Sequence, residues 1–176
     1  GLKKVSGYIA DTQRCYQGNY YAIFPQLSLS GDLGSGISNQ MVLLLNSLGM
    51  EKTDTDNDNL TVTPFMQTSD SGYAVTENDQ TQGQYILGAV STNAISADSS
   101  DSDSEDEDDK SDATDTDTKT ARLTVLTSAS MISSDITDQL TTLDNLTLFV
   151  NSVTENFDNV NNVAIEAKSL STETNT

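Results

Sequence analysis

Side chains that usually perform catalysis are scarce in this chain. It contains no histidine and one cysteine, Cys15. Ser-His-Asp and Cys-His arrangements are therefore excluded, because no imidazole is present to take the proton of a nucleophile. Zinc sites built from histidine and cysteine are excluded for the same reason. Cys15 has neither a base nor a second thiol to work with, so a packed side chain is the favoured interpretation.

Two other catalytic chemistries depend on residue types that are present. A Ser–Lys pair is available in principle, but the lysines lie at the ends of the chain or in polar runs, which is typical of solvated surface. Glycoside chemistry needs paired carboxylates, yet no Asp or Glu stands isolated in an apolar context. The sequence therefore predicts no catalytic residue, no cofactor-binding residue and no metal-binding residue.

Three segments resemble ligand-binding loops but depart from them. Residues 31–36, GDLGSG, lack both the Gly-Lys-Ser/Thr ending of a phosphate loop and the G-x-G-x-x-G order, so they favour a turn. Residues 54–58, DTDND, begin like an EF-hand, but Asn59 replaces the glycine and Phe65 the bidentate glutamate. The carboxylates between residues 101 and 117 would gather calcium only weakly, and a solvated charge run is the favoured interpretation.

Charge narrows the set of partners. The 176 residues carry a formal net charge of −19, and eleven of the 27 acidic residues lie between Asp98 and Asp117. Such a charge excludes nucleic acid, whose phosphates need Lys and Arg, and disfavours anionic lipid. Residues 98–119 are predicted to be an acidic, low-complexity insert between two strands, and residues 169–176 a polar tail.

The elements expected to carry these residues follow from short apolar runs. Apolar or alternating patterns predict strands at residues 7–10, 20–24, 41–48, 60–66, 85–90, 122–127 and 163–167. Asp144 is placed to cap a helix. The helix is expected to bury one apolar stripe, formed by Leu146, Phe149, Val150 and Val153. Several strands with a helix packed on them indicate a layered α/β or α+β domain.

Four segments carry a resemblance to a known family. They are YYAIFP at 20–25, VTPFMQTSDS at 62–71, GQYILGAV at 83–90 and RLTVLTS at 122–128. Their order and spacing resemble the GldG-like auxiliary components of ABC transporters, a family named for gliding motility. Two places depart from the family pattern. TSASM at 127–131 replaces a Gly-x-Ser-x-Phe turn, and VT at 153–154 replaces an Asn-Trp pair.

The resemblance implies a fold and a location. The fold would be an α/β domain with a layered mixed sheet and helices packed on it, glutamine-amidotransferase-like or flavodoxin-like, without catalytic residues. Residues 1–176 would form a single domain, or the C-terminal part of a larger extracytoplasmic domain. The location would be the extracytoplasmic face of a bacterial cell membrane, with the membrane reached only through anchors outside this segment.

The resemblance also implies a function. The chain would be a non-enzymatic auxiliary or adaptor domain of an ABC-type transport system, for export or gliding-like motility, and its partners would be the permease and ATPase subunits. The expected partner contacts lie in one loop: Thr68, Ser69, Asp70 and Tyr73. The main alternative is an extracellular module that binds a sugar or peptide with that loop and the Tyr-rich strand. A degenerate hydrolase-like domain is a third interpretation.

Overall fold

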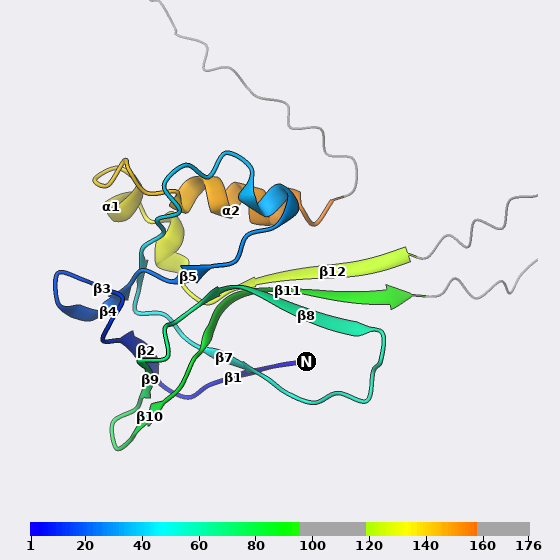
Figure 1. The fold of residues 1–176 in the computed structure, drawn as a ribbon, viewed down its shortest axis with the longest axis horizontal. Helices are drawn as coiled ribbons and strands as arrows, with labels where there is room; N and C mark the ends of the chain where they lie inside the picture. The colour runs from blue at the N-terminus through cyan, green and yellow to red at the C-terminus, as the bar shows by residue number, and fades with distance from the viewer. Residues whose placement is uncertain (96–118, 158–176) are drawn as a thin grey trace, which may run out of the picture.

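Figure 1 shows the computed structural model, which describes residues 1–95 and 119–157. This part of the chain is mostly β, with 40% strand and 17% helix. Its strands are β1 (Leu2–Lys4), β2 (Tyr8–Asp11), β3 (Cys15–Tyr16), β4 (Asn19–Ile23), β5 (Gln26–Leu27), β6 (Leu44–Leu45), β7 (Met50–Lys52), β8 (Leu60–Gln67), β9 (Gly72–Val75), β10 (Gln80–Gln82), β11 (Ile86–Ile95) and β12 (Lys119–Leu126). Its helical elements are the 3-10 turns η1 (Gly31–Gly34) and η2 (Ala129–Ile132), the single turn α1 (Ser134–Thr137) and the helix α2 (Asn145–Thr154).

The largest sheet is built around β11. One edge of β11 pairs with β8, and the other pairs first with β7 and then with β12. β1 extends the sheet beyond β7, and β5 extends it beyond β8. Two smaller sheets, β10-β9-β2 and β3-β4-β6, complete the described strands.

The expected layered α/β fold, glutamine-amidotransferase-like or flavodoxin-like, is wrong. The described strands form three antiparallel sheets. Parallel strands need crossover connections of a dozen or more residues, usually helical. The described connections between strands before β12 contain only one helical turn, η1. The apolar run at 85–90 is buried because β11 is the central strand of an antiparallel sheet.

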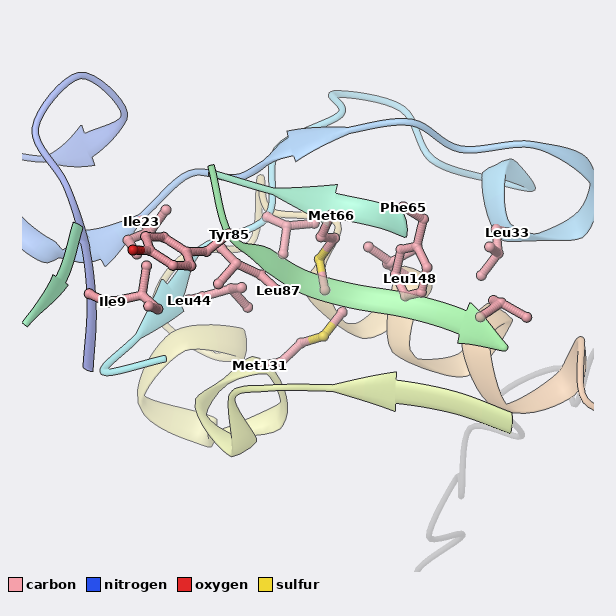
Figure 2. Close-up of a cluster of buried hydrophobic side chains, with 13 residues drawn as sticks. Ile9, Ile23, Leu33, Leu44, Phe65, Met66, Tyr85, Leu87, Met131 and Leu148 are labelled. Atoms are coloured by element: carbon pink, nitrogen blue, oxygen red, sulfur yellow. The ribbon is translucent and has the colours of Figure 1, made fainter. Parts of the chain in front are cut away.

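The main hydrophobic core lies between one face of the large sheet and the helical elements. Figure 2 shows Met131 of η2 and Leu148 of α2 on the same side as Phe65, Met66 and Leu87 of the sheet strands. A second, smaller cluster of Met50, Ile86 and Ala89 packs with Leu2, Val62 and Val125. Cross-strand partners share a face. Val62, Ser91 and Leu123 therefore lie on the face away from α2.

Most predicted strands are confirmed, with shifted ends. The predictions at 7–10, 20–24, 60–66, 85–90 and 122–127 correspond to β2, β4, β8, β11 and β12. The buried strand expected at 41–48 is mostly wrong, since only Leu44–Leu45 pairs as a strand. The glycine-rich turn at 31–36 contains η1. The predicted strand at 163–167, the tail at 169–176 and residues 96–118 of the insert region lie outside the described residues.

The helix predicted after Asp144 is confirmed as α2, but the face it was expected to bury is wrong. Leu146, Val150 and Val153 are 56%, 45% and 44% exposed. The residues that α2 buries are Asn145, Leu148, Asn151 and Ser152. Of the expected stripe, Phe149 alone packs against the core. The helix therefore buries three polar side chains beside Leu148 and leaves three apolar side chains exposed.

Candidate functional site

The predicted contact loop joins β8 to β9, and half of it is buried. Thr68 and Ser69 are 0% and 2% exposed. Tyr73 is half-buried within β9, and Asp70 is exposed. Of the four residues expected to touch a partner, only Asp70 and Tyr73 are therefore open to one. The buried pair instead holds neighbouring segments together.

Ser69 binds a buried carboxylate that sequence reasoning did not select. Asp11, at the end of β2, is 0% exposed. Its Oδ2 accepts the backbone N–H of Ser69 (2.7 Å), and its Oδ1 accepts the Ser69 hydroxyl (2.8 Å). The backbone N–H groups of Gln13 and Arg14 also donate to Oδ1, each at 2.9 Å. This carboxylate thus joins the β2–β3 turn to the β8–β9 loop.

The hydrogen bonds around Asp11 decide its protonation. Burial raises the pKa of the carboxyl, but the bonds from Arg14, Ser69 and Gln13 together outweigh burial and hold the pKa below its ordinary value of 3.8. Asp11 is therefore a charged structural anchor at neutral pH. Its oxygens accept hydrogen bonds from N–H and O–H groups of the β2–β3 turn and the β8–β9 loop that would otherwise lack acceptors.

Thr68 also joins two segments through hydrogen bonds. Its backbone N–H donates to the carbonyl of Tyr85 (2.9 Å), and its hydroxyl oxygen accepts the N–H of Tyr85 (2.9 Å). The Tyr85 hydroxyl donates to the carbonyl of Thr81 (2.8 Å). Burial, followed by the charge of Glu51, raises the pKa of Tyr85 above its ordinary value of 10.0. Thr68 therefore joins the β8–β9 loop to Tyr85, the residue before β11.

A second buried polar cluster attaches α2 to the segment at 38–45. Asp144, 6% exposed, accepts the backbone N–H groups of Ser38 (3.2 Å), Asn39 (2.9 Å) and Met41 (3.3 Å). The next residue, Asn145, accepts the N–H of Leu43 (2.9 Å) and donates to its carbonyl (2.8 Å). Asp144 makes no side-chain cap within its own helix.

Side chains replace a neighbouring strand along this segment. The Ser130 hydroxyl oxygen accepts the N–H of Leu45 (2.8 Å), and the Ser128 hydroxyl donates to the Leu45 carbonyl (2.8 Å). Asn151, further along α2, donates to the carbonyls of Leu33 (3.1 Å) and Ser35 (2.7 Å). Buried backbone groups need partners, and these polar side chains supply them.

α2 buries Asn145, Asn151 and Ser152 beside Leu148, and it leaves a row of apolar side chains exposed. Leu146, Val150 and Val153 follow one another at spacings of four and three residues, which places them on one side of the helix axis, and Phe157 lies three residues beyond the end of the helix. All four are exposed, Phe157 to 61%. We call these four residues the α2 stripe. Single exposed apolar residues are normal on proteins, but an aligned row on one helix is not.

Two cavities are lined in part by reactive or charged side chains. One of ≈ 280 Å³ is lined by Arg14, Cys15, Phe24 and Met41 among others, and Cys15 is a half-buried free thiol. Another, of ≈ 200 Å³, lies over the large sheet beside an ion pair between Arg122 and Glu155. Arg122 Nε and Glu155 Oε2 are buried without hydrogen-bond partners among the described residues.

Neither cavity assembles a recognisable catalytic set. In residues 1–95 and 119–157 no group of three or more His, Cys, Asp or Glu side chains is placed to hold a metal ion. The acidic residues at 54–58 are exposed in the β7–β8 loop. Among the described elements, no helix is long and apolar enough to cross a membrane.

Comparisons with known proteins give no neighbour for this chain. No family model, curated protein or solved structure matches it. Function must therefore be argued from the geometry and from the resemblance carried by the four segments.

Sequence reasoning missed the buried polar side chains because Asp and Asn are common on protein surfaces. Asp11, Asn145 and Asn151 stand in a chain rich in Asp, Asn, Ser and Thr, so composition does not separate them. One signal was present. Asn145 and Asn151 interrupt the apolar helix pattern six residues apart and so lie within about 120° of each other around the helix. That signal marks two polar positions on the helix, but only the tertiary contacts show that both are buried.

Proposed function

We propose that this chain is a non-enzymatic auxiliary domain of an ABC-type transport system, for export or gliding-like motility. It would act on the extracytoplasmic face of a bacterial cell membrane by binding the permease, and through the permease it would be associated with the ATPase. The observation that carries the proposal is the α2 stripe. An apolar row facing outward, on a helix that is already held to its own domain by another face, is the arrangement of a helix that docks on another protein.

Charge favours a protein surface over a lipid surface as the partner. The α2 stripe is uncharged, and the two acidic residues that flank the helix, Asp144 and Glu155, are turned toward the core and toward Arg122. Interfacial membrane helices carry Lys and Arg on their polar faces, whereas α2 carries neither. An uncharged apolar face suits an apolar groove or helix on a protein partner.

The sugar- or peptide-binding alternative has less support. Tyr20 and Tyr21 are 50% and 37% exposed, but the ≈ 280 Å³ cavity next to their strand has Phe24 as its one aromatic lining residue. Sugar and peptide sites generally use several convergent polar groups with aromatic walls.

The proposal is tested by co-purification of the natural protein that carries this chain. Val150→Ser combined with Val153→Ser is expected to reduce the permease recovered by about tenfold or more, because fully burying a valine side chain is worth about 1.5 kcal/mol or more. The melting temperature of the isolated chain should hardly change, since both side chains are exposed. Circular dichroism melting provides that second measurement.

Two further variants make the test specific. Tyr20→Ser removes a comparably exposed apolar side chain from β4 and should leave permease recovery unchanged. Tyr73→Ala tests the predicted loop in the same assay. Failure of the unaltered protein to co-purify with any ABC permease would rule the function out, and unchanged recovery with the double variant would rule out the α2 stripe as the docking face.

A further inference from the structure

The ≈ 200 Å³ cavity over the large sheet is lined by hydroxyl groups that the protein itself does not use. Ser28 and Ser30 come from the segment after β5, Thr63 from β8 and Thr92 from β11. Within the described residues, no hydrogen bond engages the hydroxyl of any of these four side chains. Ser28, Ser30 and Thr63 are exposed and Thr92 is half-buried, so a small molecule can reach all four.

The ion pair between Arg122 and Glu155 forms a further part of the cavity wall. Arg122 Nε is a donor and Glu155 Oε2 an acceptor, and neither has a partner among the described residues. A hydroxyl group can accept from the one and donate to the other. Both atoms are buried in this arrangement, so a ligand would satisfy them through a turn of the two side chains, which are 27% and 17% exposed.

The floor of the cavity is apolar. Leu33, Phe65 and Val90 line it and are 4%, 1% and 5% exposed. Figure 2 shows Leu33 and Phe65 at the same end of the core. A few polar groups above an apolar floor are the usual composition of a small-molecule site.

Hydrogen bonds hold the walls of the cavity in place. The N–H of Ser28 donates to the carbonyl of Phe65 (3.0 Å), which fixes the segment after β5 on the sheet. Asn151 of α2 donates to the carbonyl of Leu33 in η1 (3.1 Å). The ion pair joins the end of α2 to β12. The site is therefore largely preformed, which lowers the entropy lost on binding.

We propose that this cavity binds a neutral, polyhydroxylated small molecule, such as a single sugar or a cyclic polyol. Its volume is below the roughly 300–1,000 Å³ of pockets for drug-sized ligands, so it suits a molecule of about one sugar ring. The site is separate from the α2 stripe and from the Tyr-rich strand, and the inference does not depend on the proposed function.

Charge favours a neutral ligand over an ionic one. Arg122 and Glu155 are the two charged residues of the lining, and they neutralise each other. An anion would also be repelled by the net charge of −19. A cation would find the one carboxylate of the lining already paired with Arg122. Hydroxyl groups need no counter-charge and match the four free hydroxyls of the wall.

NMR titration of the full chain with glucose and with myo-inositol tests the proposal. Saturable shifts of the backbone amide signals of Thr63, Thr92 and Arg122 are the expected result with at least one of the two. Acetate and methylammonium at the same ionic strength should bind at least about fivefold more weakly, because the lining is neutral. Nuclear Overhauser contacts from the bound ligand to the methyl groups of Leu33 and Val90 should place it on the apolar floor.

A pair of variants locates the site. Thr63→Val combined with Thr92→Val removes two hydroxyls, keeps the side-chain shape and suits a strand. It should raise the Kd of the bound polyol by about fivefold or more, since two hydrogen bonds are lost. Thr61→Val, on the same strand and face as Thr63 but outside the cavity lining, is the matched control and should leave the Kd unchanged.

Four results would overturn the proposal. The first is the absence of saturable shifts with both polyols, and the second is acetate that binds as tightly as they do. The third is equal weakening by the control and by the double variant. The fourth is a set of Overhauser contacts showing that another part of the chain fills the cavity. The titration and the ligand contacts in the unaltered chain decide the matter even if the double variant does not fold.

Discussion

Asp11 shows how much a single buried carboxylate holds together in this protein. It accepts four hydrogen bonds from three residues, Gln13, Arg14 and Ser69. Asp11→Asn replaces one acceptor oxygen by an amide that cannot accept, so the free energy of unfolding near pH 7 should fall by roughly 2–3 kcal/mol. Urea denaturation measures this loss. Asp70→Asn, exposed in the loop that Asp11 braces, should change stability by less than about 0.5 kcal/mol.

The same variant has a defined pH dependence. The pKa of Asp11 lies below its ordinary value of 3.8 in the folded protein, so its stabilisation is complete above that value. The stabilisation is lost as the pH falls below 3.8 and through the folded pKa. The difference between the unaltered chain and Asp11→Asn should therefore shrink in acid. A difference that stayed constant down to about pH 2 would show that the Asp11 charge contributes nothing.

Gly7 and Gly18 form a matched pair at the residue scale. Both have a positive φ, 86° and 77°. A Cβ on Gly7 would lie 2.1 Å from the carbonyl oxygen of Val75, whereas a Cβ on Gly18 would meet nothing within 4 Å. Gly18→Ala should cost only the backbone strain, about 1–2 kcal/mol. Gly7→Ala should cost at least about 2 kcal/mol more in urea denaturation, because the β2–β9 pairing must shift. Equal losses would contradict the close approach.

At the scale of the element, α2 is held to the domain by buried polar side chains as well as by Leu148. Asn145 makes three side-chain hydrogen bonds, to the N–H and carbonyl of Leu43 and to the carbonyl of Met131. Asn145→Ala should therefore lower the free energy of unfolding by roughly 2–4 kcal/mol, since it leaves buried backbone groups without partners. Val150→Ser should change it by less than about 0.5 kcal/mol. Thermal and urea unfolding of both variants measure the two effects. A larger loss of stability for Val150→Ser than for Asn145→Ala would mean that the helix buries Val150 and exposes Asn145.

At the scale of the whole molecule, the acidic insert lies in a hairpin connection. Ile95 and Lys119 are register partners at the open end of β11 and β12, so residues 96–118 begin and end next to each other. A short Gly/Ser turn can replace them, because closing a shorter loop costs less entropy. The melting temperature should stay equal or rise slightly at low salt, where repulsion among the removed carboxylates is strongest. A marked fall would mean that the insert supports the fold.

Local sequence patterns predicted individual strands better than they predicted how those strands pair. Alternation in LTVT at 60–63 and the apolar run at 85–90 were sufficient to predict β8 and β11. Neither pattern specifies the partner or the direction of a strand, because a central antiparallel strand and a buried parallel strand can look alike in sequence. The layered α/β expectation failed at that step.

Composition by itself determined what the protein lacks, including any imidazole, and it set the charge of −19. Only the tertiary structure decided which polar residues are buried. Thr68 and Ser69 stand in a polar loop, and Asn145 and Asn151 on a helix whose sequence is amphipathic, yet all four are buried and bonded to distant segments. The reason is that a buried backbone group without a strand partner requires a side-chain partner, and which groups lack one is settled only when the sheets assemble.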